Sequence, residues 1–293
     1  MNRRIALSAL GGALLAGRAA LSQKPGKTPS LCVYSGNLSK IPYSDLAEIV
    51  KQMGYDGVDL TVMKGGHVDP SLYMVHLDRA FQTFHDAALE LPMVTTSFTS
   101  ASQPFAYQIF YVSALFGAKF CRLGTWPPFS GSDLAARAGT LRNVLTQFAA
   151  TGSQCKITPL LANHAGSFPG RSIPETEALV SGIVPGAFGY CFDPAQAVIE
   201  GNSADAWESA LQAALPRLGA VALSDVTLEK TTARPCALGE GVIDWKKFFS
   251  VLATARFNGP VSLHLDYETR NDVNSMTKDL AFARAKVAEA WKA

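Results

Sequence analysis

The sequence has few cysteines, and their spacing gives no pairing pattern. Five occur among 293 residues, without a Cys-x-x-Cys pair or a zinc-type spacing: Cys32, Cys121, Cys155, Cys191 and Cys236. Because the number is odd, at least one thiol is unpaired unless two chains are bridged. Cys32, Cys121 and Cys191 fall inside apolar runs, so we expect them to be small buried core residues.

The chain also lacks an excess of charge and a long apolar run. It has 26 basic and 24 acidic residues, a net charge of +2, and no run of Lys and Arg beyond the N-terminus. A protein that binds nucleic acid needs a basic face, so no nucleic-acid partner is predicted. No segment reaches the ~20 consecutive apolar residues of a membrane span.

The first residues have the pattern of an export signal. Asn2-Arg3-Arg4 precedes a short Gly- and Ala-rich apolar run over residues 5–17, and small residues follow at 18–22. The adjacent arginines favour a twin-arginine signal; a disordered or surface-helical N-terminus is the alternative. We therefore assign residues 1–24 to a signal peptide and residues 25–293 to one domain. This predicts a periplasmic or otherwise exported protein with no membrane association after signal removal.

Short β-rich runs alternate with longer amphipathic stretches in the rest of the chain, which predicts βαβ units and a parallel sheet. Helices are expected at Tyr43–Met53, Leu72–Leu89, Asp133–Thr151, Asp205–Leu215, Asp244–Ala255 and Ser275–Trp291, with caps at Ser44 or Asp45, Asp133 and Asp244. Strands are expected at Leu31–Ser35, Gly57–Val62, Pro92–Ser97, Lys119–Gly124, Ile157–Asn163, Phe188–Asp193, Ala220–Asp225 and Pro260–Asp266.

Eight strands with intervening helices predict a closed (β/α)8 TIM barrel in a single domain. An open doubly wound sheet usually carries a Gly-rich phosphate loop after its first strand, where this chain has Ser35-Gly36-Asn37-Leu38. In a TIM barrel the functional residues lie at the carboxyl ends of the strands. The polar residues at those ends are Asp59, Thr61, Thr96, Ser97, Arg122, Thr125, Asn163, His164, Asp193, Ser224, Asp225, His264 and Asp266.

Several motifs along these strands resemble one known family. They are Met53-Gly54-Tyr55-Asp56-Gly57-Val58-Asp59, Asn163-His164-Ala165-Gly166, Cys191-Phe192-Asp193-Pro194, Leu238-Gly239-Glu240-Gly241-Val242-Ile243-Asp244-Trp245 and Gly259-Pro260-Val261-Ser262-Leu263-His264. Their order and spacing, from about residue 30 to 270, resemble the sugar phosphate isomerase/epimerase family, the xylose-isomerase-like barrels. Gly65-Gly66-His67-Val68 is similar to an exported subgroup.

The resemblance implies chemistry on sugars or sugar-like hydroxyketones. Family members hold a divalent metal with Glu, Asp, His and Glu on strands 5 to 8, and a carboxylate moves a proton through an enediolate. At the matching positions this chain has Ala162, Asp193, the segment Ala222-Leu223-Ser224-Asp225 in place of His-x-Lys-Asp, and His264. Gln196 stands where the family often has a His. Of the usual ligands, only Asp193 is therefore unchanged.

A different set of ligands remains open. Because side chains alternate along a strand, His164 points into the barrel mouth if residue 162 does, and Asp266 does so if His264 does. His164, Asp193, His264 and Asp266 would then converge, and two imidazoles with two carboxylates suit Mn, Zn or Fe. The same four residues could instead perform acid–base chemistry without a metal.

Other residues are predicted to contact substrate. Glu240, in a Gly-flanked loop, is a candidate catalytic residue or a solvent-facing turn residue. His67, Arg122, Trp126, Asn163 and Gln196 are candidate substrate-binding residues. Arg122 suits an anion and Trp126 a sugar face, although Trp126 also begins a stiff Trp-Pro-Pro loop. Asp59 is a candidate ion-pair partner of Arg122.

The residues and motifs leave three functions open. The first is an isomerase- or epimerase-like enzyme that removes a proton next to the carbonyl of a sugar or keto-sugar, with a keto-glycoside lyase or hydratase as a variant. The second is a non-catalytic periplasmic barrel that binds a small carbohydrate. Ala162, Ala222 and Gln196, which replace residues of the usual family site, favour this function. The third is a metal-dependent nuclease of the related barrels, which the charge balance argues against.

Overall fold

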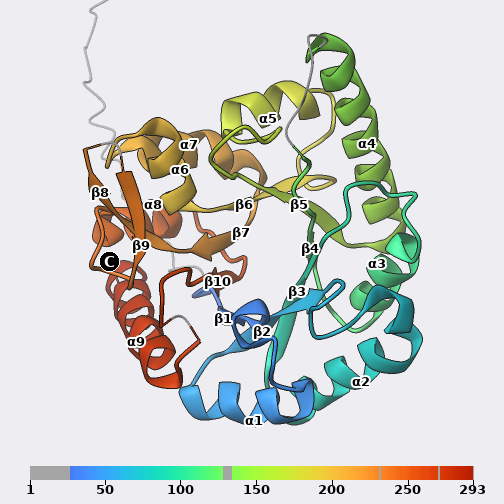
Figure 1. Ribbon diagram of the computed structural model, residues 1–293, viewed down its shortest axis with the longest axis horizontal. Helices are drawn as coiled ribbons and strands as arrows, with labels where there is room; N and C mark the ends of the chain where they lie inside the picture. Colours follow the sequence, from blue (N-terminus) through green and yellow to red (C-terminus); the bar gives the residue numbers. More distant parts are fainter. Residues whose placement is uncertain (1–26, 128–133, 231, 270, 293) are drawn as a thin grey trace, which may run out of the picture.

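The computed structural model describes residues 27–127, 134–230, 232–269 and 271–292, so the predicted signal peptide lies outside the described residues. A closed barrel of parallel strands forms the centre of the molecule (Figure 1). Its strands are β1 (Leu31–Tyr34), β2 (Gly57–Val62), β3 (Glu90–Thr96), β4 (Phe120–Arg122), β5 (Thr158–Ala162), β6 (Gly189–Phe192), β7 (Leu218–Leu223) and β10 (Val261–Leu263). Pairing of β1 with β10 closes the ring, which confirms the predicted TIM barrel.

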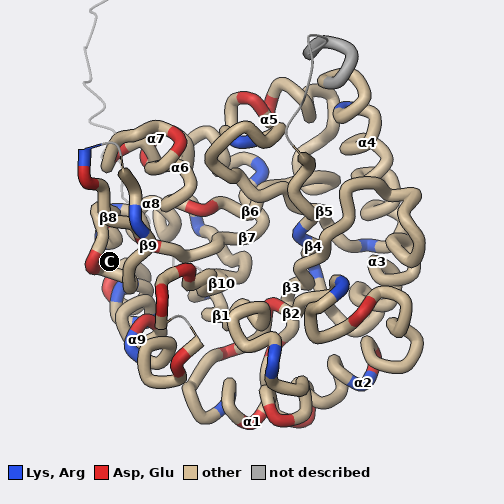
Figure 2. The backbone as a smooth tube through the Cα atoms, in the orientation of Figure 1, with Lys and Arg blue, Asp and Glu red and all other residues tan. Residues whose placement is uncertain are grey.

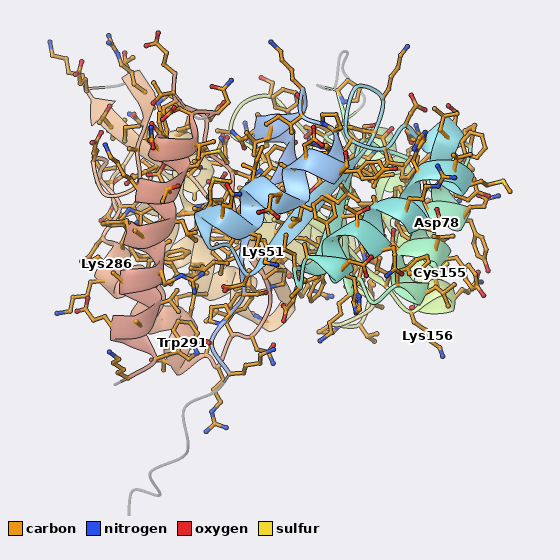
Figure 3. The ribbon with its side chains drawn as sticks, turned by 90° about the horizontal axis from the view of Figure 1, so that it is seen from below. Lys51, Asp78, Cys155, Lys156, Lys286 and Trp291 are labelled. Atoms are coloured by element: carbon orange, nitrogen blue, oxygen red, sulfur yellow. The ribbon has the colours of Figure 1, made fainter. Side chains whose placement is uncertain are left out.

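Helices cover the outside of the barrel (Figure 1). They are α1 (Tyr43–Met53), α2 (Tyr73–Asp86), α3 (Ala106–Leu115), α4 (Leu134–Cys155), α5 (Ile173–Val180), α6 (Pro194–Gly201), α7 (Ala206–Ala214), α8 (Trp245–Thr254) and α9 (Val273–Ala290). Short 3-10 turns lie at Ser35–Leu38, Pro70–Leu72 and Leu215–Arg217. Seen from below, α9, α1 and α2 lie side by side along one flank (Figure 3).

Local signals explain several helix ends. Helix α1 buries Leu46, Val50 and Met53 on one face and ends at Gly54, whose φ of 88° favours glycine. Asp244 caps α8 by accepting the Lys247 N–H at 3.0 Å, as predicted. The predicted cap of α1 by Ser44 or Asp45 is wrong, because the helix begins at Tyr43 with Pro42 before it. The predicted cap Asp133 lies outside the described residues.

The seventh strand differs most from the prediction. Strand β7 ends at Leu223, and Asp225 instead begins an antiparallel hairpin of β8 (Asp225–Glu229) and β9 (Thr232–Cys236). The carboxylate of Asp225 points to a following loop, where it accepts N–H groups of Gly239 and Gly241. This hairpin projects beyond the barrel strands and was not expected from the sequence.

A small apolar cluster fills the barrel interior. It consists of Met93, Leu160, Cys191, Ala220 and Ala222, with Phe120 and Ala162 packed against it. A much larger core lies between the strands and the helices. Cys32, Cys121 and Cys191 are buried, as predicted, and their thiols are free. Asp59 and Ser262, level with Met93 and Ala222 in the strand register, are buried polar residues beside this cluster and are hydrogen-bonded to each other.

Charges are dispersed over the outer surface. Lys and Arg alternate with Asp and Glu around the helices without a large region of one sign (Figure 2). Within the described part of the chain, no helix combines the length and apolar character that crossing a membrane requires.

Candidate active site

A cavity of about 260 Å³ lies at the carboxyl ends of the barrel strands. Its lining includes many of the predicted residues, namely Arg122, Asn163, His164, Asp193, Gln196 and His264, with the exposed Asp266 beside them. A larger groove of about 960 Å³ lies at the opposite, amino-terminal end, where residues that precede β1, β4 and β10 line it. We place the site in the smaller cavity, because function in this fold resides at the carboxyl ends of the strands.

His67 and Trp126 lie outside the lining of this cavity. Both ring nitrogens of His67 are engaged, Nδ1 with Thr61 Oγ1 and Nε2 with the carbonyl of Ile41, each at 3.1 Å. Burial lowers the pKa of His67, so its imidazole is neutral and ties two loops together. Trp126 is 9% exposed and packs edge-on against Phe148. The structure therefore gives both residues contacts within the protein.

Glu240 is exposed and is likewise absent from the cavity lining. Its loop is held by Asp225, which accepts hydrogen bonds from the N–H groups of Gly239 and Gly241 and from Trp245 Nε1. Asp225 thus organises the motif around Glu240. The structure does not bring Glu240 together with the other predicted catalytic residues.

Asp193 lies at the boundary between β6 and α6, and its two carboxylate oxygens differ. Oδ1 accepts hydrogen bonds from the N–H groups of Ala195 and Gln196 and from Ser224 Oγ, at 2.9, 3.2 and 2.8 Å. Oδ2 has no hydrogen-bond partner among the described residues, and the side chain lines the cavity. Burial raises the pKa of Asp193 and outweighs the hydrogen bonds and the nearby Arg122, which lower it.

Asn163 fixes the backbone of Asp193. Its side-chain amide donates to the Asp193 carbonyl and accepts from the Asp193 N–H, both at 2.8 Å. Asn163 is 4% exposed, so its amide atoms are already committed inside the protein. This arrangement makes Asn163 a positioning residue between β5 and β6.

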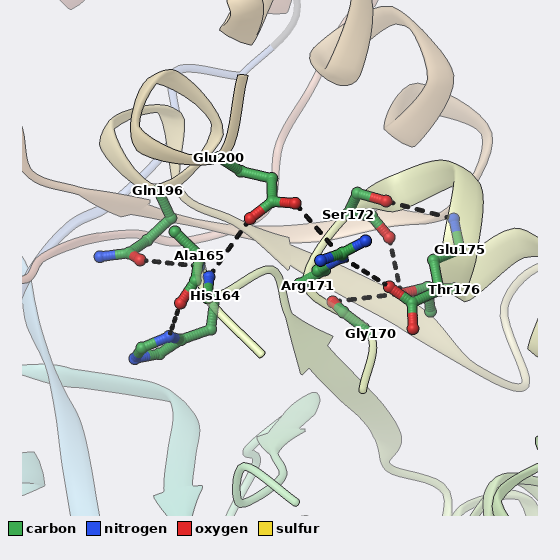
Figure 4. Close-up of polar contacts among 10 residues, drawn as sticks. His164, Ala165, Gly170, Arg171, Ser172, Glu175, Thr176, Gln196 and Glu200 are labelled. Carbon is green, nitrogen blue, oxygen red and sulfur yellow. Dashed lines mark hydrogen bonds and ion pairs between the residues drawn. The ribbon is translucent and has the colours of Figure 1, made fainter. Parts of the chain in front are cut away.

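The loop after β5 carries His164 and is fastened to α6 (Figure 4). Gln196 Oε1 accepts the Ala165 N–H at 3.0 Å, and Glu200 accepts the Gly166 N–H at 3.2 Å while pairing with Arg171. His164 Nδ1 lies 3.0 Å from the Ala165 carbonyl, which can only accept a hydrogen bond. The proton of a neutral His164 is therefore on Nδ1, and Nε2 is left with a lone pair.

His264 is held between Asp59 and Arg122. Its Nδ1 lies 3.2 Å from Arg122 Nη1 and its Nε2 lies 3.1 Å from Asp59 Oδ2. Because a guanidinium only donates, Nδ1 accepts, and Nε2 carries the proton that it donates to Asp59. Burial and the Arg122 charge lower the pKa of His264, while Asp59 opposes this shift. The imidazole is therefore neutral, and it separates the predicted partners Asp59 and Arg122.

Tyr34 and Asn37 complete the cavity and were missed in the sequence. The Tyr34 ring stacks on His264, with centroids 4.0 Å apart and planes 14° apart. Asn37 donates to the Leu265 carbonyl at 2.6 Å, and its Oδ1 is buried without a partner among the described residues. Tyr34 is the last residue of the first strand and Asn37 follows it, so the strand-end criterion could have found them had it included β1.

The residues at the family's metal positions do not fit a divalent ion. Ala162 and Ala222 lie on the barrel interior and offer no donor atom, and both nitrogens of His264 are engaged. In the described ranges, no three His, Cys, Asp or Glu side chains converge to hold a metal. His164, Asp193, His264 and Asp266 therefore do not form the predicted four-residue metal site.

The closed barrel with a polar cavity at its carboxyl end defines a protein of the TIM-barrel class. A family model described as xylose isomerase-like TIM barrel matches residues 47–286, so the chain belongs to this family. No curated protein sequence matches it significantly.

Solved structures with the same fold share little sequence with this chain. A xylose isomerase domain protein from Alicyclobacillus acidocaldarius has a TM-score of 0.72 at 15% identity, covering 89% of this chain and 99% of that one. A 3-keto-D-glucoside 4-epimerase from E. coli has a TM-score of 0.68 at 13% identity, covering 88% and 99%. A D-allulose 3-epimerase from Methylomonas sp., in complex with D-allulose, has a TM-score of 0.67 at 14% identity, covering 90% and 99%.

Proposed function

We propose that this protein is a carbohydrate-active, isomerase- or epimerase-like enzyme that removes a proton next to the carbonyl of a sugar or keto-sugar. The observation that carries the proposal is the free Oδ2 of Asp193, in a polar cavity that also receives His164. Pockets for drug-sized ligands measure ~300–1,000 Å³. The cavity of about 260 Å³ suits a smaller molecule, such as a monosaccharide.

Asp193 and His164 have different roles in the proposed proton transfer. Asp193 Oδ2 takes the proton from carbon, and its raised pKa makes it a stronger base than an ordinary carboxylate once ionised. His164 exchanges a proton with a substrate hydroxyl through Nε2, since Nδ1–H is held by the Ala165 carbonyl. Neighbours that act on keto-sugars or bind D-allulose support the carbohydrate class.

Two alternatives have support of their own. The same base and imidazole would serve a keto-glycoside lyase or hydratase, in which loss of the proton expels a neighbouring oxygen. Ala162 and Ala222, which remove ligand positions of the family, favour a sugar-binding barrel without catalysis. In each case the partner is a small carbohydrate, and we propose that the protein acts after export.

Solvent exchange into a ketohexose tests the proposal. The protein is incubated with D-allulose, D-fructose or D-tagatose in D2O, and deuterium next to the carbonyl is followed by NMR. Asp193→Asn is expected to lower the exchange rate by ~10²–10⁴-fold, the usual contribution of general acid–base catalysis. Asp86→Asn, an exposed carboxylate on α2, serves as the control.

The possible outcomes separate the three functions. Exchange that persists at the wild-type rate in Asp193→Asn would contradict the role of this carboxylate. Binding of the sugar in calorimetry without any exchange would favour the sugar-binding barrel. Release of an alcohol from a 3-keto-glucoside would favour the lyase or hydratase.

A further inference from the structure

Arg122 carries a charge that no ion pair neutralises within the described residues. Its Nη1 donates to His264, which is neutral, and its Nε is buried without a hydrogen-bond partner. The charge of Arg122 lowers the pKa of Asp193, but the two side chains form no salt bridge among the described residues. The guanidinium therefore lies in the cavity wall with its charge available to a ligand.

The surroundings of Arg122 hold it in a fixed direction. The Asp59 carboxylate is fully buried and accepts hydrogen bonds from Thr95 Oγ1 at 2.7 Å, Ser262 Oγ at 2.9 Å and His264 Nε2 at 3.1 Å. These contacts and the stacked Tyr34 ring fix the plane of His264. The Nδ1 lone pair of His264 then accepts a hydrogen bond from Arg122. The guanidinium is therefore oriented by a series of hydrogen bonds that runs from Asp59 through His264.

The methyl groups of Ala162 and Ala222 occupy the barrel positions at which the family places metal ligands. The mouth thus has a fixed guanidinium, and in the described part of the chain no three His, Cys, Asp or Glu side chains converge there to hold a divalent ion. We propose that Arg122, oriented by His264 and Asp59, binds the substrate's carbonyl oxygen and supplies the positive charge that a metal supplies elsewhere in the family. This inference rests on the proposed proton transfer.

The proton transfer balances with the substrate and solvent water alone. Asp193 Oδ2 takes the proton as the C–H bond breaks, the C–H electron pair forms a C=C bond, and the π pair of the carbonyl moves onto its oxygen to give an enediolate. The enediolate oxygen accepts hydrogen bonds from Arg122, an interaction that strengthens as negative charge develops. Return of the proton from Asp193 to the neighbouring carbon, while His164 moves the hydroxyl proton to the other oxygen, gives the isomer. The epimer forms when Asp193 releases its proton to solvent and a water molecule protonates the original carbon from the opposite face.

Chelation and substitution of Arg122 test this role. Deuterium exchange into the three ketohexoses is measured after dialysis against EDTA, for the wild type, Arg122→Met, Arg122→Lys and the exposed control Arg79→Met. We expect exchange to survive EDTA. Arg122→Met should lower kcat by ~10²–10³-fold, as loss of one oxyanion donor does. Arg122→Lys should recover part of the rate, and sugar affinity measured by calorimetry should change less than kcat.

A second readout addresses the positioning chain. Long-range ¹H–¹⁵N spectra should show His264 as the neutral Nε2–H tautomer in the wild type and should lose that signature in Asp59→Asn. Exchange that requires added Mn²⁺ would overturn the role of Arg122 and leave the proposed function intact, as would a full rate in Arg122→Met. Absence of exchange in the wild type, with and without Mn²⁺, would overturn both.

Helix α3 carries a separate observation. It lies on the outside of the barrel, yet its sequence AYQIFYVSAL contains no charged residue. Tyr107, Tyr111 and Leu115, spaced by four residues, are 47%, 51% and 68% exposed, and Phe116 follows at 43%. An outer helix whose exposed side chains are uncharged and mostly apolar is a candidate for being covered by a partner.

The exposed face of α3 continues onto α2. Phe81 on α2 stacks on Phe116, which directly follows α3, and Tyr73 at the start of α2 packs against Phe105 just before α3, so the two helices lie alongside each other. Met74, next to Tyr73, is 78% exposed. With ~150–250 Å² per large side chain, Met74 and the four exposed residues on and directly after α3 together expose roughly 400–700 Å². A standard interface buries ~800 Å² per partner, of which ~57% is apolar. The exposed apolar area of this face is therefore large enough for a standard interface.

We infer that a second copy of this chain covers the α2–α3 face. A face without charge on its central helix can meet itself about a two-fold axis without burying an unpaired ion. Sedimentation velocity should show a dimer for the wild type and a monomer for Tyr111→Glu combined with Leu115→Glu. Val184→Glu, which changes an exposed apolar residue away from this face, should remain dimeric. A monomeric wild type, or a dimeric double variant, would overturn the inference.

Discussion

The side chain of Asp193 serves structure and chemistry through different atoms. Oδ1 caps α6 and accepts from Ser224, while Oδ2 is free at the cavity. The capping contacts keep the carboxylate in one orientation, and Asn163 fixes the backbone behind it. A base held this firmly loses little entropy when a substrate C–H bond approaches it.

The pH dependence of exchange should report Asp193. Burial raises the pKa of this carboxyl above the ordinary value of ~3.9, and only the ionised form can accept a proton. We therefore expect kcat/KM to fall with decreasing pH through a limb above the ordinary range of Asp. A profile that stays flat down to pH ~4 would contradict the assignment.

The free energy of unfolding should change with pH in the direction opposite to activity, because ionisation of Asp193 favours the reaction but disfavours the folded state. Because the folded state holds this proton more tightly than the unfolded state, ionisation of Asp193 lowers the free energy of unfolding as pH rises from the unfolded pKa through the folded pKa. Asp193→Asn should remove this part of the pH dependence. Urea unfolding of both proteins at several pH values measures the difference, and parallel curves would argue against a raised pKa.

At the scale of elements, the loop that follows the β8–β9 hairpin depends on one carboxylate. Asp225 accepts from Gly239, Gly241 and Trp245, and a methyl group at Gly241 would lie 2.0 Å from Asp225 Oδ1. The motif around Glu240 therefore needs Gly241 so that the backbone can approach Asp225 closely. This explains the Gly-Glu-Gly sequence without a role for Glu240 in chemistry.

Asp225→Ala should destabilise the protein by about 2–4 kcal/mol, because several buried donors lose their acceptor. Asp244→Ala, which removes only the cap of α8, should cost about 1 kcal/mol. Thermal unfolding measures both, and the emission of the buried Trp245 should shift to longer wavelength in the first variant. Equal losses of stability would show that the three hydrogen bonds to Asp225 contribute no more than the single cap.

At the scale of the whole molecule, export is the prediction that depends least on the barrel. Replacing Arg3 and Arg4 by Lys should retain the full-length precursor in the cytoplasm, because the twin-arginine pathway reads that pair. Cell fractionation and the mass of the N-terminal peptide measure the outcome. Unchanged secretion of the variant would point to a general secretory signal or to a different N-terminal function.

The sequence by itself determined the barrel, because hydrophobic periodicity and strand spacing are local properties of the chain. It also predicted that Arg122, His164, Asp193 and His264 lie at the barrel mouth, where they line the cavity, because strand ends meet at one face of a TIM barrel. Local pattern could not place Glu240, His67 and Trp126, which lie in loops whose direction depends on distant contacts.

Only the tertiary structure decided which strand-end residues touch. Asp59 and His264 are separated by most of the chain, yet closure of the ring between β1 and β10 brings them within 3.1 Å. That contact occupies a nitrogen which the sequence alone left available to a metal. With His264 between them, Arg122 has no ion pair with Asp59, and its guanidinium lines the cavity. The sequence could not show this, because packing in the folded chain decides which side chains become partners.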